Sequence, residues 1–360
     1  MWGRFVLMLA VILMPFYSYS QQGRQMAADI PEKYCKSLEA MCSYISSNYN
    51  DSESRLWCLY CWEARHISYD LSQIHVQKNF KDEDELAEWT LENRRGVCSN
   101  FARLFCVVAV RLGIECYFVE GYSSSNLSAL SDSSHAWCAC IVNGSPYIID
   151  PTWGEGYMAG SSSVRKFNGN YFMIEPSSSI KQRMPLDPVF QFSEYPIRYE
   201  EFDRKNADNT KSSAAKFSWR DTLECYSKMS HLGQMESRLG RMMANGEPND
   251  VVRKNVSVLK HNIGAARYNS YSDRFNELSD RLGNVYSAVS SKRRQTYTKN
   301  VLLEEVDKIG NMYDELKTDV AETEFYDVNI TKASKSMLAK IEQTKKSIAR
   351  FRKQVVSSCK

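Results

Sequence analysis

Apolar side chains recur every three or four positions over the region that follows residue 30, which is the spacing of a helix with one buried face. This pattern predicts two helices within residues 31–66, separated by a polar break at Asp51-Ser52. A third helix is expected over 82–92, with acidic residues at its start as the helix dipole favours. A further apolar stripe begins at Cys98 and stops at Gly113, a residue typical of helix ends.

The pattern then changes to short apolar runs separated by turn residues. Three of these runs are expected strands: residues 114–122, 135–142 and 147–150. Asn143-Gly144 lies between the last two and is a strong signal for a β-hairpin. Residues 154–169 are rich in Gly and Ser and predict a loop, and 167–174 is a candidate strand. Helices that feed into an antiparallel sheet predict an α+β fold.

A second composition begins near residue 205. Residues 206–215 are polar and aperiodic and predict a linker, after which helix formers dominate. Narrow apolar stripes on charged helices predict an all-α region with long helices, a helical hairpin or a short coiled coil. The expected domains are therefore 21–204 and a separable helical region over 205–360. A solvated structural arm is favoured over a binding groove, and the helices are candidates for contact with an assembly partner.

The first twenty residues resemble no other part of the chain. Arg4 precedes an almost wholly apolar run over 5–16, and Ser18 and Ser20 supply small residues before Gln21. This is the pattern of a cleavable signal peptide over 1–20, which predicts a secreted or periplasmic protein. An uncleaved anchor is the alternative, although the run is shorter than the ~20 residues that a spanning helix needs. We expect no membrane span in the mature chain.

Composition narrows the function classes. The net charge of +3 and the lack of a basic patch with interleaved aromatics argue against nucleic-acid binding. The eleven cysteines include Cys58 and Cys61, a CxxC pair within an expected amphipathic helix. A role as small core residues is favoured there, with a thiol–disulfide site as the weaker alternative. A zinc site would need a second close cysteine pair or nearby histidines, and the sequence shows neither. No metal and no cofactor are therefore expected.

Three short segments together offer a thiol, an imidazole and a carboxylate. Cys98 opens a helical stripe, and the positive end of a helix dipole favours a thiolate there. Backbone N–H groups at such a helix start are also natural donors to an oxyanion. His135 and Asp150 lie on either side of the expected hairpin. A cysteine nucleophile needs a base and an acid that orients that base, so these residues form a candidate triad.

The hairpin register supports this grouping. With Asn143-Gly144 as a two-residue turn, paired residue numbers sum to 287, which places His135 opposite Thr152. Asp150 then faces the same side of the sheet as a diagonal neighbour, roughly 7–8 Å from His135 at the backbone. A hydrogen bond between the two side chains is therefore expected.

Five ordered motifs carry a resemblance to the core of the transglutaminase-like superfamily. They are Gly96-Val97-Cys98, Leu112-Gly113-Ile114, Gly121-Tyr122, His135-Ala136-Trp137 and the segment from Asp150 to Tyr157, Asp-Pro-Thr-Trp-Gly-Glu-Gly-Tyr. The resemblance covers about residues 55–200, and the sequence there is similar to that of secreted bacterial members. It implies a papain-like fold with Cys98 as nucleophile, His135 as base and Asp150 as orienting acid. The flanking β-domains and the acidic calcium loop of animal transglutaminases have no counterpart here.

The sequence therefore predicts an exported cysteine enzyme that acts on amide bonds of protein or peptide substrates, by acyl transfer or by hydrolysis. Trp137, Trp153 and Tyr157 are the obvious water-excluding groups near the triad and are candidate substrate-binding residues. Because few such groups are available to exclude water, hydrolysis is slightly favoured. The alternative is a catalytically silent binding or scaffold protein with the same fold.

Overall fold

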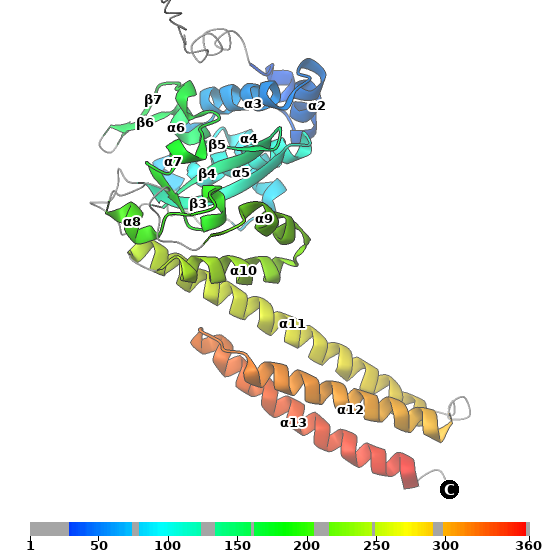
Figure 1. Ribbon diagram of the computed structural model, residues 1–360. Helices are drawn as coiled ribbons and strands as arrows, with labels where there is room; N and C mark the ends of the chain where they lie inside the picture. Colours follow the sequence, from blue (N-terminus) through cyan, green and yellow to red (C-terminus); the bar gives the residue numbers. More distant parts are fainter. Residues whose placement is uncertain are drawn as a thin grey trace, which may run out of the picture. The chain divides into compact units, whose positions relative to one another are not determined.

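The computed structural model describes residues 29–73, 79–123, 134–159, 162–204, 216–246, 249–290 and 298–357 (Figure 1). The expected signal peptide, most of the serine-rich stretch before His135 and the linker over 206–215 lie outside these residues. The chain divides into two compact units between Pro185 and Leu186. We call the described residues up to Pro185 the sheet unit and those from Leu186 onwards the helical unit.

Four helices build the first half of the sheet unit. They are α2 (Leu38–Asn48), α3 (Ser52–His66), α4 (Glu83–Asn93) and α5 (Cys98–Arg111). The side chains of Ser37, Asp51 and Asp82 accept hydrogen bonds from the first turns of α2, α3 and α4, which fixes where these helices start. The helices predicted from the apolar spacing are thus confirmed.

One antiparallel sheet follows, with strand order β5-β4-β3-β8. Its strands are β3 (Glu115–Ser123), β4 (Ser134–Val142), β5 (Ser145–Ile149) and β8 (Arg183–Pro185). The expected hairpin register is confirmed from Val142–Ser145 to Cys138–Ile149. Asn143 and Gly144 both have positive φ angles, 51° and 75°, as a two-residue type I′ turn requires.

The segment after β5 differs from its prediction. The loop expected over 154–169 contains the end of α6 (Pro151–Glu155) and a hairpin of β6 (Gly156–Ala159) with β7 (Ser162–Arg165). The strand expected over 167–174 is wrong: a 3-10 turn occupies Gly169–Tyr171, and one isolated bridge joins Ile174 to Ile148. A short apolar run packed against a sheet edge has the same composition as a strand, which explains the error. A short helix α7 (Pro176–Ser179) then leads to β8.

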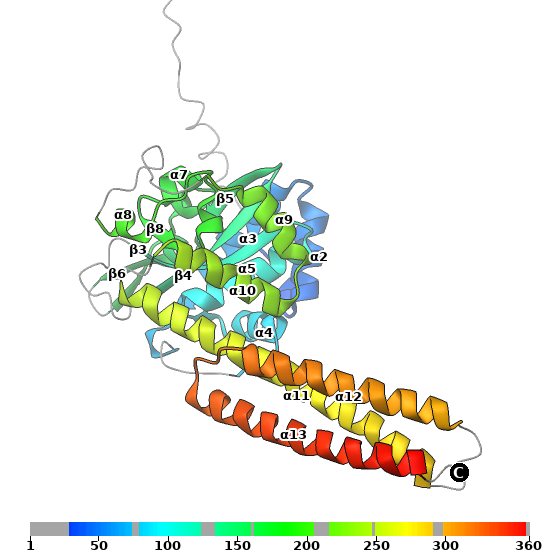
Figure 2. The same ribbon diagram turned by 60° about the horizontal axis from the view of Figure 1, so that its bottom comes forward.

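Helix α5 is the centre of the core of the sheet unit. One of its faces packs on β3 and β4, and its other neighbours include α3 and α4 (Figure 2). Phe101, Ala102, Phe105 and Ala109, the predicted apolar stripe, are all completely buried. Because it is held on both sides, the residue at the start of α5 has a fixed position relative to the sheet.

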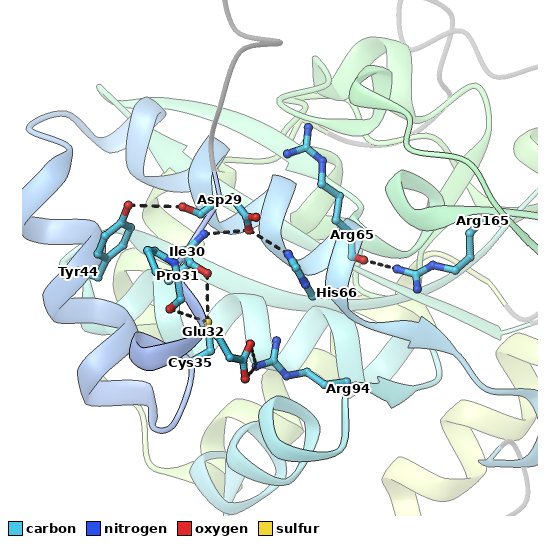
Figure 3. Close-up of polar contacts among 10 residues, drawn as sticks. All are labelled: Asp29, Ile30, Pro31, Glu32, Cys35, Tyr44, Arg65, His66, Arg94 and Arg165. Carbon is cyan, nitrogen blue, oxygen red and sulfur yellow. Dashed lines mark hydrogen bonds and ion pairs between the residues drawn. The ribbon is translucent and has the colours of Figure 1, made fainter.

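The first described residues are tied to the helices beside the site (Figure 3). Asp29 Oδ1 lies 2.9 Å from His66 Nε2 at the end of α3, and its carbonyl accepts from Tyr44 Oη. Glu32 forms an ion pair at 3.2 Å with Arg94, the residue that ends α4 in a left-handed conformation. Arg94 directly precedes β2 (Arg95–Gly96), so these contacts help to fix the approach to Cys98.

The helical unit is dominated by three long helices, α11 (Asp250–Ser290), α12 (Lys299–Glu322) and α13 (Val328–Ser357); the later part of α11 packs against α12 and α13 (Figure 1). Shorter helices precede them: α8 (Tyr199–Asp203), α9 (Trp219–Lys228) and α10 (His231–Ala244). The bundle core includes Val306, Ile309, Leu316, Ile341 and Ile348. No helix of the described residues combines the length and the apolar character that crossing a membrane requires.

Residues 186–204 pack within the helical unit, although the expected domain boundary lies at residue 204. Asp187 accepts two hydrogen bonds from Arg241 at 2.6 and 2.7 Å, and the Ile197 carbonyl accepts from Asn245. Phe192 meets Trp219 edge to face at 5.1 Å. This segment therefore gains its partners from helices that follow the polar linker.

We expect a chain ended at residue 204 to aggregate, because it would expose the apolar side chains of 186–204 that α9 and α10 cover. A chain ended at Gly246 retains both helices and is the matched control. The measurement is the monomeric fraction of each protein in size-exclusion chromatography. Equal recovery of both as monomers would show that 186–204 needs no helical partner.

Candidate active site

Cys98 is the first residue of α5 and is partly buried against the core. The preceding strand β2 pairs in parallel with β1 (Ser68–Tyr69), so the chain enters the helix from a fixed direction. Gly96 is needed at this approach: a Cβ there would lie 2.4 Å from the Cβ of Asn100. Asn100 in turn accepts from the Val97 N–H at 3.0 Å and donates to Thr90 at 3.2 Å. These contacts hold the thiol at the positive end of the helix dipole, as predicted.

His135 and Asp150 form the expected hydrogen bond. The distance from His135 Nε2 to Asp150 Oδ2 is 2.8 Å, and the two side chains are 10% and 0% exposed. His135 lies near the start of β4, where it pairs with Gly121 of β3. Since Nε2 is engaged by Asp150, Nδ1 is the ring nitrogen left to exchange a proton with a thiol.

Asp150 is not part of the β4–β5 pairing, although the predicted register places it there. The ladder between β4 and β5 ends at Cys138–Ile149, and the chain turns into α6 directly after Asp150. Asp150 caps that helix: its Oδ1 accepts from the Trp153 N–H at 3.0 Å. The cap orients one carboxylate oxygen along α6 and leaves the other for the imidazole.

Arg183 is a site residue that the sequence did not reveal. Its Nη2 lies 3.2 Å from Asp150 Oδ2, and its side chain is 1% exposed. The guanidinium carbon lies 3.9 Å from the centre of the Trp153 ring and 5.1 Å from that of Tyr171, distances typical of cation–π contacts. A single Arg in the short strand β8 carries no motif, so only the paired strand β3 brings it to the site.

The charges of the site support one another. Burial alone would lower the pKa of His135, but the charge and hydrogen bond of Asp150, followed by the interactions of Cys98, raise it to about 9. Burial would likewise raise the pKa of Asp150, but the charges of His135 and Arg183 hold it below its ordinary value. An imidazolium beside a carboxylate is therefore the stable form near neutral pH. Asp150 and Cys98 are thus the two groups whose interactions favour the protonated form of His135.

The three predicted aromatic residues occupy different positions. Trp153 stacks on the His135 ring at 5.0 Å with an interplanar angle of 14°. Trp137 is 1% exposed and fills the space above Gly121, where a Cβ would lie 2.2 Å from its ring. Tyr157 lies on β6 and is 56% exposed. Trp137 and Trp153 thus support the base from two sides, while contact of any of the three with a substrate stays a prediction.

Tyr69 is a further aromatic residue that belongs to the site. Burial, followed by the charges of Cys98 and Asp150, raises the pKa of its hydroxyl. Tyr69 lies on β1, beside the strand that leads to Cys98. The sequence alone assigns Tyr69 no role, because a lone Tyr in a two-residue strand gives no signal.

Comparison with known families decides what this arrangement is. A family model described as the transglutaminase-like superfamily matches residues 39–151. The matched range contains Cys98, His135 and Asp150, the candidate triad. Residues 39–151 belong to the transglutaminase-like superfamily. Arg183 lies beyond the matched range, so the charge partner of Asp150 is contributed by a later part of the chain.

Two curated relatives match somewhat less than half of this chain. The kyphoscoliosis peptidases of Mus musculus and Homo sapiens are each 26% identical to this chain over 174 and 175 residues, or 46% of it. The chain spans about a quarter of the length of these relatives, 25% and 26%. A solved structure described as a TGase is 15% identical and covers 42% of this chain and 40% of its own, with a TM-score of 0.27. The helices and the antiparallel sheet confirm the predicted α+β fold, and the family match over residues 39–151 assigns this part of the chain to a cysteine-type enzyme family.

The raised pKa of His135 predicts a loss of activity in alkaline solution. Because the pKa in the folded chain is about 9 against an ordinary 6.5, the imidazolium stabilises the fold fully below 6.5, and this contribution is lost as the pH rises through about 9. We expect kcat/KM to fall through the same range, since the imidazolium must protonate the leaving amine. The measurement is a pH–rate profile together with urea unfolding at about pH 6 and about pH 10. A profile flat to about pH 10 would contradict the assignment of His135.

Proposed function

We propose that this protein is an exported cysteine enzyme that cleaves or transfers acyl groups at amide bonds of protein or peptide substrates. The observation that carries the proposal is the 2.8 Å bond between His135 and a fully buried Asp150, next to a thiol at a helix start. A solvated or purely structural His does not need a buried carboxylate with its own arginine partner. The kyphoscoliosis peptidases, which carry peptidase in their name, are consistent with this chemistry.

The proposed reaction has two steps. The Cys98 thiolate attacks a substrate carbonyl carbon, and the His135 imidazolium gives its proton to the departing amine, which leaves a thioester on Cys98. Water or a second amine then attacks the thioester, with neutral His135 taking the proton. Asp150 keeps Nε2 protonated and Nδ1 directed to the reacting groups. Amide N–H groups at the start of α5, which have no partner within a helix, can bind the oxyanion.

Hydrolysis is the outcome that we favour. Transfer to an amine requires that water be kept from the thioester. Trp137 and Trp153 both contact the His135 ring, but Tyr157, the third candidate, is 56% exposed. An exposed Tyr157 supplies little apolar cover against water, which supports hydrolysis.

The test is to incubate the mature chain with a glutamine-rich protein and a labelled primary amine. We expect new peptide termini or deamidated glutamine, both absent with Cys98→Ala and unchanged with Cys225→Ala, which replaces an exposed thiol of the helical unit. Incorporation of the amine in excess of hydrolysis would identify a transamidase instead. No reaction of either kind with a range of proteins would favour the silent binding protein.

Export and assembly complete the proposal. The first twenty residues have the composition of a cleavable signal, so the mature chain is expected to begin at Gln21. N-terminal sequencing of the exported protein tests this, and an intact Met1 on the exported form would indicate an uncleaved anchor. The α11–α13 bundle is proposed as the surface for an assembly partner, because it presents charged outer faces around its own apolar core.

A further inference from the structure

Four cysteine side chains meet on the face of the sheet that packs against α5. Cys106 comes from α5, Cys116 from β3, and Cys138 and Cys140 from β4. The sulfur of Cys116 lies 3.3 Å from that of Cys106 and 3.2 Å from that of Cys140. The sulfurs of Cys106, Cys116 and Cys138 all lie within 4.8 Å of one another. The proposed reaction uses none of these thiols.

The fold explains why they converge. Cys116 and Cys140 are direct partners across the antiparallel pair β3–β4. Cys138 is two residues before Cys140 and therefore points to the same side of the sheet. Its thiol donates to the carbonyl of Ala102, one turn before Cys106 on α5. The sequence separations of 10, 22 and 2 residues match no metal-binding motif, so the cluster is invisible before the strands are paired.

The spacing of the sulfurs fits metal coordination better than a disulfide. Thiolates about 2.3 Å from a tetrahedral ion lie about 3.8 Å apart, which small side-chain movements from the observed positions can reach. A disulfide requires about 2.05 Å, and Cys116 faces two competing partners at nearly equal distances. Any single disulfide would leave two buried thiols unused.

The surroundings can balance the charge of such a site. The guanidinium of Arg103 lies 4.0 Å from the ring centre of Phe118, the residue paired with Cys138, although it also forms an ion pair with Glu83. Glu63 of α3 is completely buried, and among the described residues neither of its carboxyl oxygens has a hydrogen-bond partner. Glu63 lies on α3, which packs on α5, so its unsatisfied carboxyl group is a candidate hydrogen-bond partner for a metal-bound thiolate.

We propose that Cys106, Cys116 and Cys138 bind a thiophilic metal ion, Zn²⁺ or Cu⁺; Cys140, which contacts Cys116 at 3.2 Å but lies outside this group of three, can become the fourth ligand only by moving towards the ion. Soft thiolate ligands select these ions over Mg²⁺ or Ca²⁺. The ion would link α5, which carries Cys98, to β4, which carries His135. The site is therefore structural: it fixes the distance between nucleophile and base and takes no part in the reaction. The proposal does not depend on the proposed activity.

The test uses the full mature chain, purified under reducing conditions and freed of metal. Zn²⁺ and Cu⁺ are titrated separately against a chromophoric chelator, and Co²⁺ serves as an optical probe for thiolate ligation. We expect one ion per chain, with a thiolate-to-cobalt charge-transfer band. Cys106→Ser and Cys138→Ser should each weaken binding by more than about 100-fold. Cys225→Ser is the matched control and should bind as the wild type does.

Thermal unfolding provides a second readout in case a variant folds poorly. The ion that binds more tightly should raise the Tm of the wild type and of Cys225→Ser, and a chelator should reverse this. Unchanged binding in folded Cys106→Ser and Cys138→Ser would overturn the proposal. So would a wild-type chain that binds neither ion, or one in which mass mapping finds a disulfide between two of the four cysteines and no metal uptake.

Discussion

Replacing Asp150 with Asn is expected to lower the turnover of the amide substrate by about 10⁴-fold, because the imidazole loses the acceptor that fixes its tautomer. An amide can present its NH₂ group to Nε2, which would place the ring proton on Nδ1, facing the thiol. The measurement is kcat under saturating substrate. Turnover within about tenfold of wild type in a folded variant would exclude Asp150 from the triad.

The ion pair with Arg183 adds a consequence for stability. Asp150→Asn leaves a guanidinium that is 1% exposed without its charge partner, so the variant should also unfold more readily. The double variant Asp150→Asn/Arg183→Met removes both charges. We expect it to recover stability relative to Asp150→Asn but to recover no turnover, which separates the catalytic effect from the structural one.

Arg183→Met alone is expected to destabilise the chain by about 3–5 kcal/mol, because the fully buried Asp150 carboxylate loses one of its two positive partners and keeps only His135. The free energy of unfolding in urea at neutral pH is the measurement. Activity should fall as well, since the orientation of Asp150 depends on both neighbours.

Arg95→Met is the matched control for this substitution. Arg95 is 52% exposed and lies 3.6 Å from Asp70, a surface pair whose loss typically costs less than about 1 kcal/mol. If Arg183→Met and Arg95→Met changed the unfolding free energy equally, the buried ion pair would contribute nothing to the fold.

The candidate triad of Cys98, His135 and Asp150 could be predicted from the sequence because each residue lies next to a clear local pattern. Cys98 opens a long apolar stripe, and Asn143-Gly144 fixes the register that brings His135 and Asp150 together. The register prediction was correct up to Cys138–Ile149. It did not foresee that Asp150 would leave the ladder and cap α6, since a helix of five residues has no periodicity to read.

Features that depend on long-range pairing could not be predicted. Arg183 reaches Asp150 through β8, a three-residue strand at the edge of the sheet. The cysteine cluster likewise needs the pairing of β3 with β4 and the packing of α5. A 3-10 turn replaced the strand expected over 167–174 because local composition does not show which short runs find a partner.

For the long helices, the sequence predicted helical structure but not which apolar residues are buried. Val306, Ile309 and Leu316 are buried as their spacing indicates, but Val301 is 50% exposed and its neighbour Leu302 is buried instead. Two adjacent apolar residues leave the exact face of a helix undetermined until its partner helices are present.

The account rests on Cys98 being a thiol activated by His135. The most direct test is alkylation of the native chain with limiting iodoacetamide at about pH 6, followed by mapping of the adduct by mass spectrometry. We predict dominant labelling of Cys98 among the eleven cysteines, and labelling at least about tenfold slower in His135→Gln. First labelling of another cysteine, or an unchanged rate for Cys98 in a folded His135→Gln variant, would contradict the account.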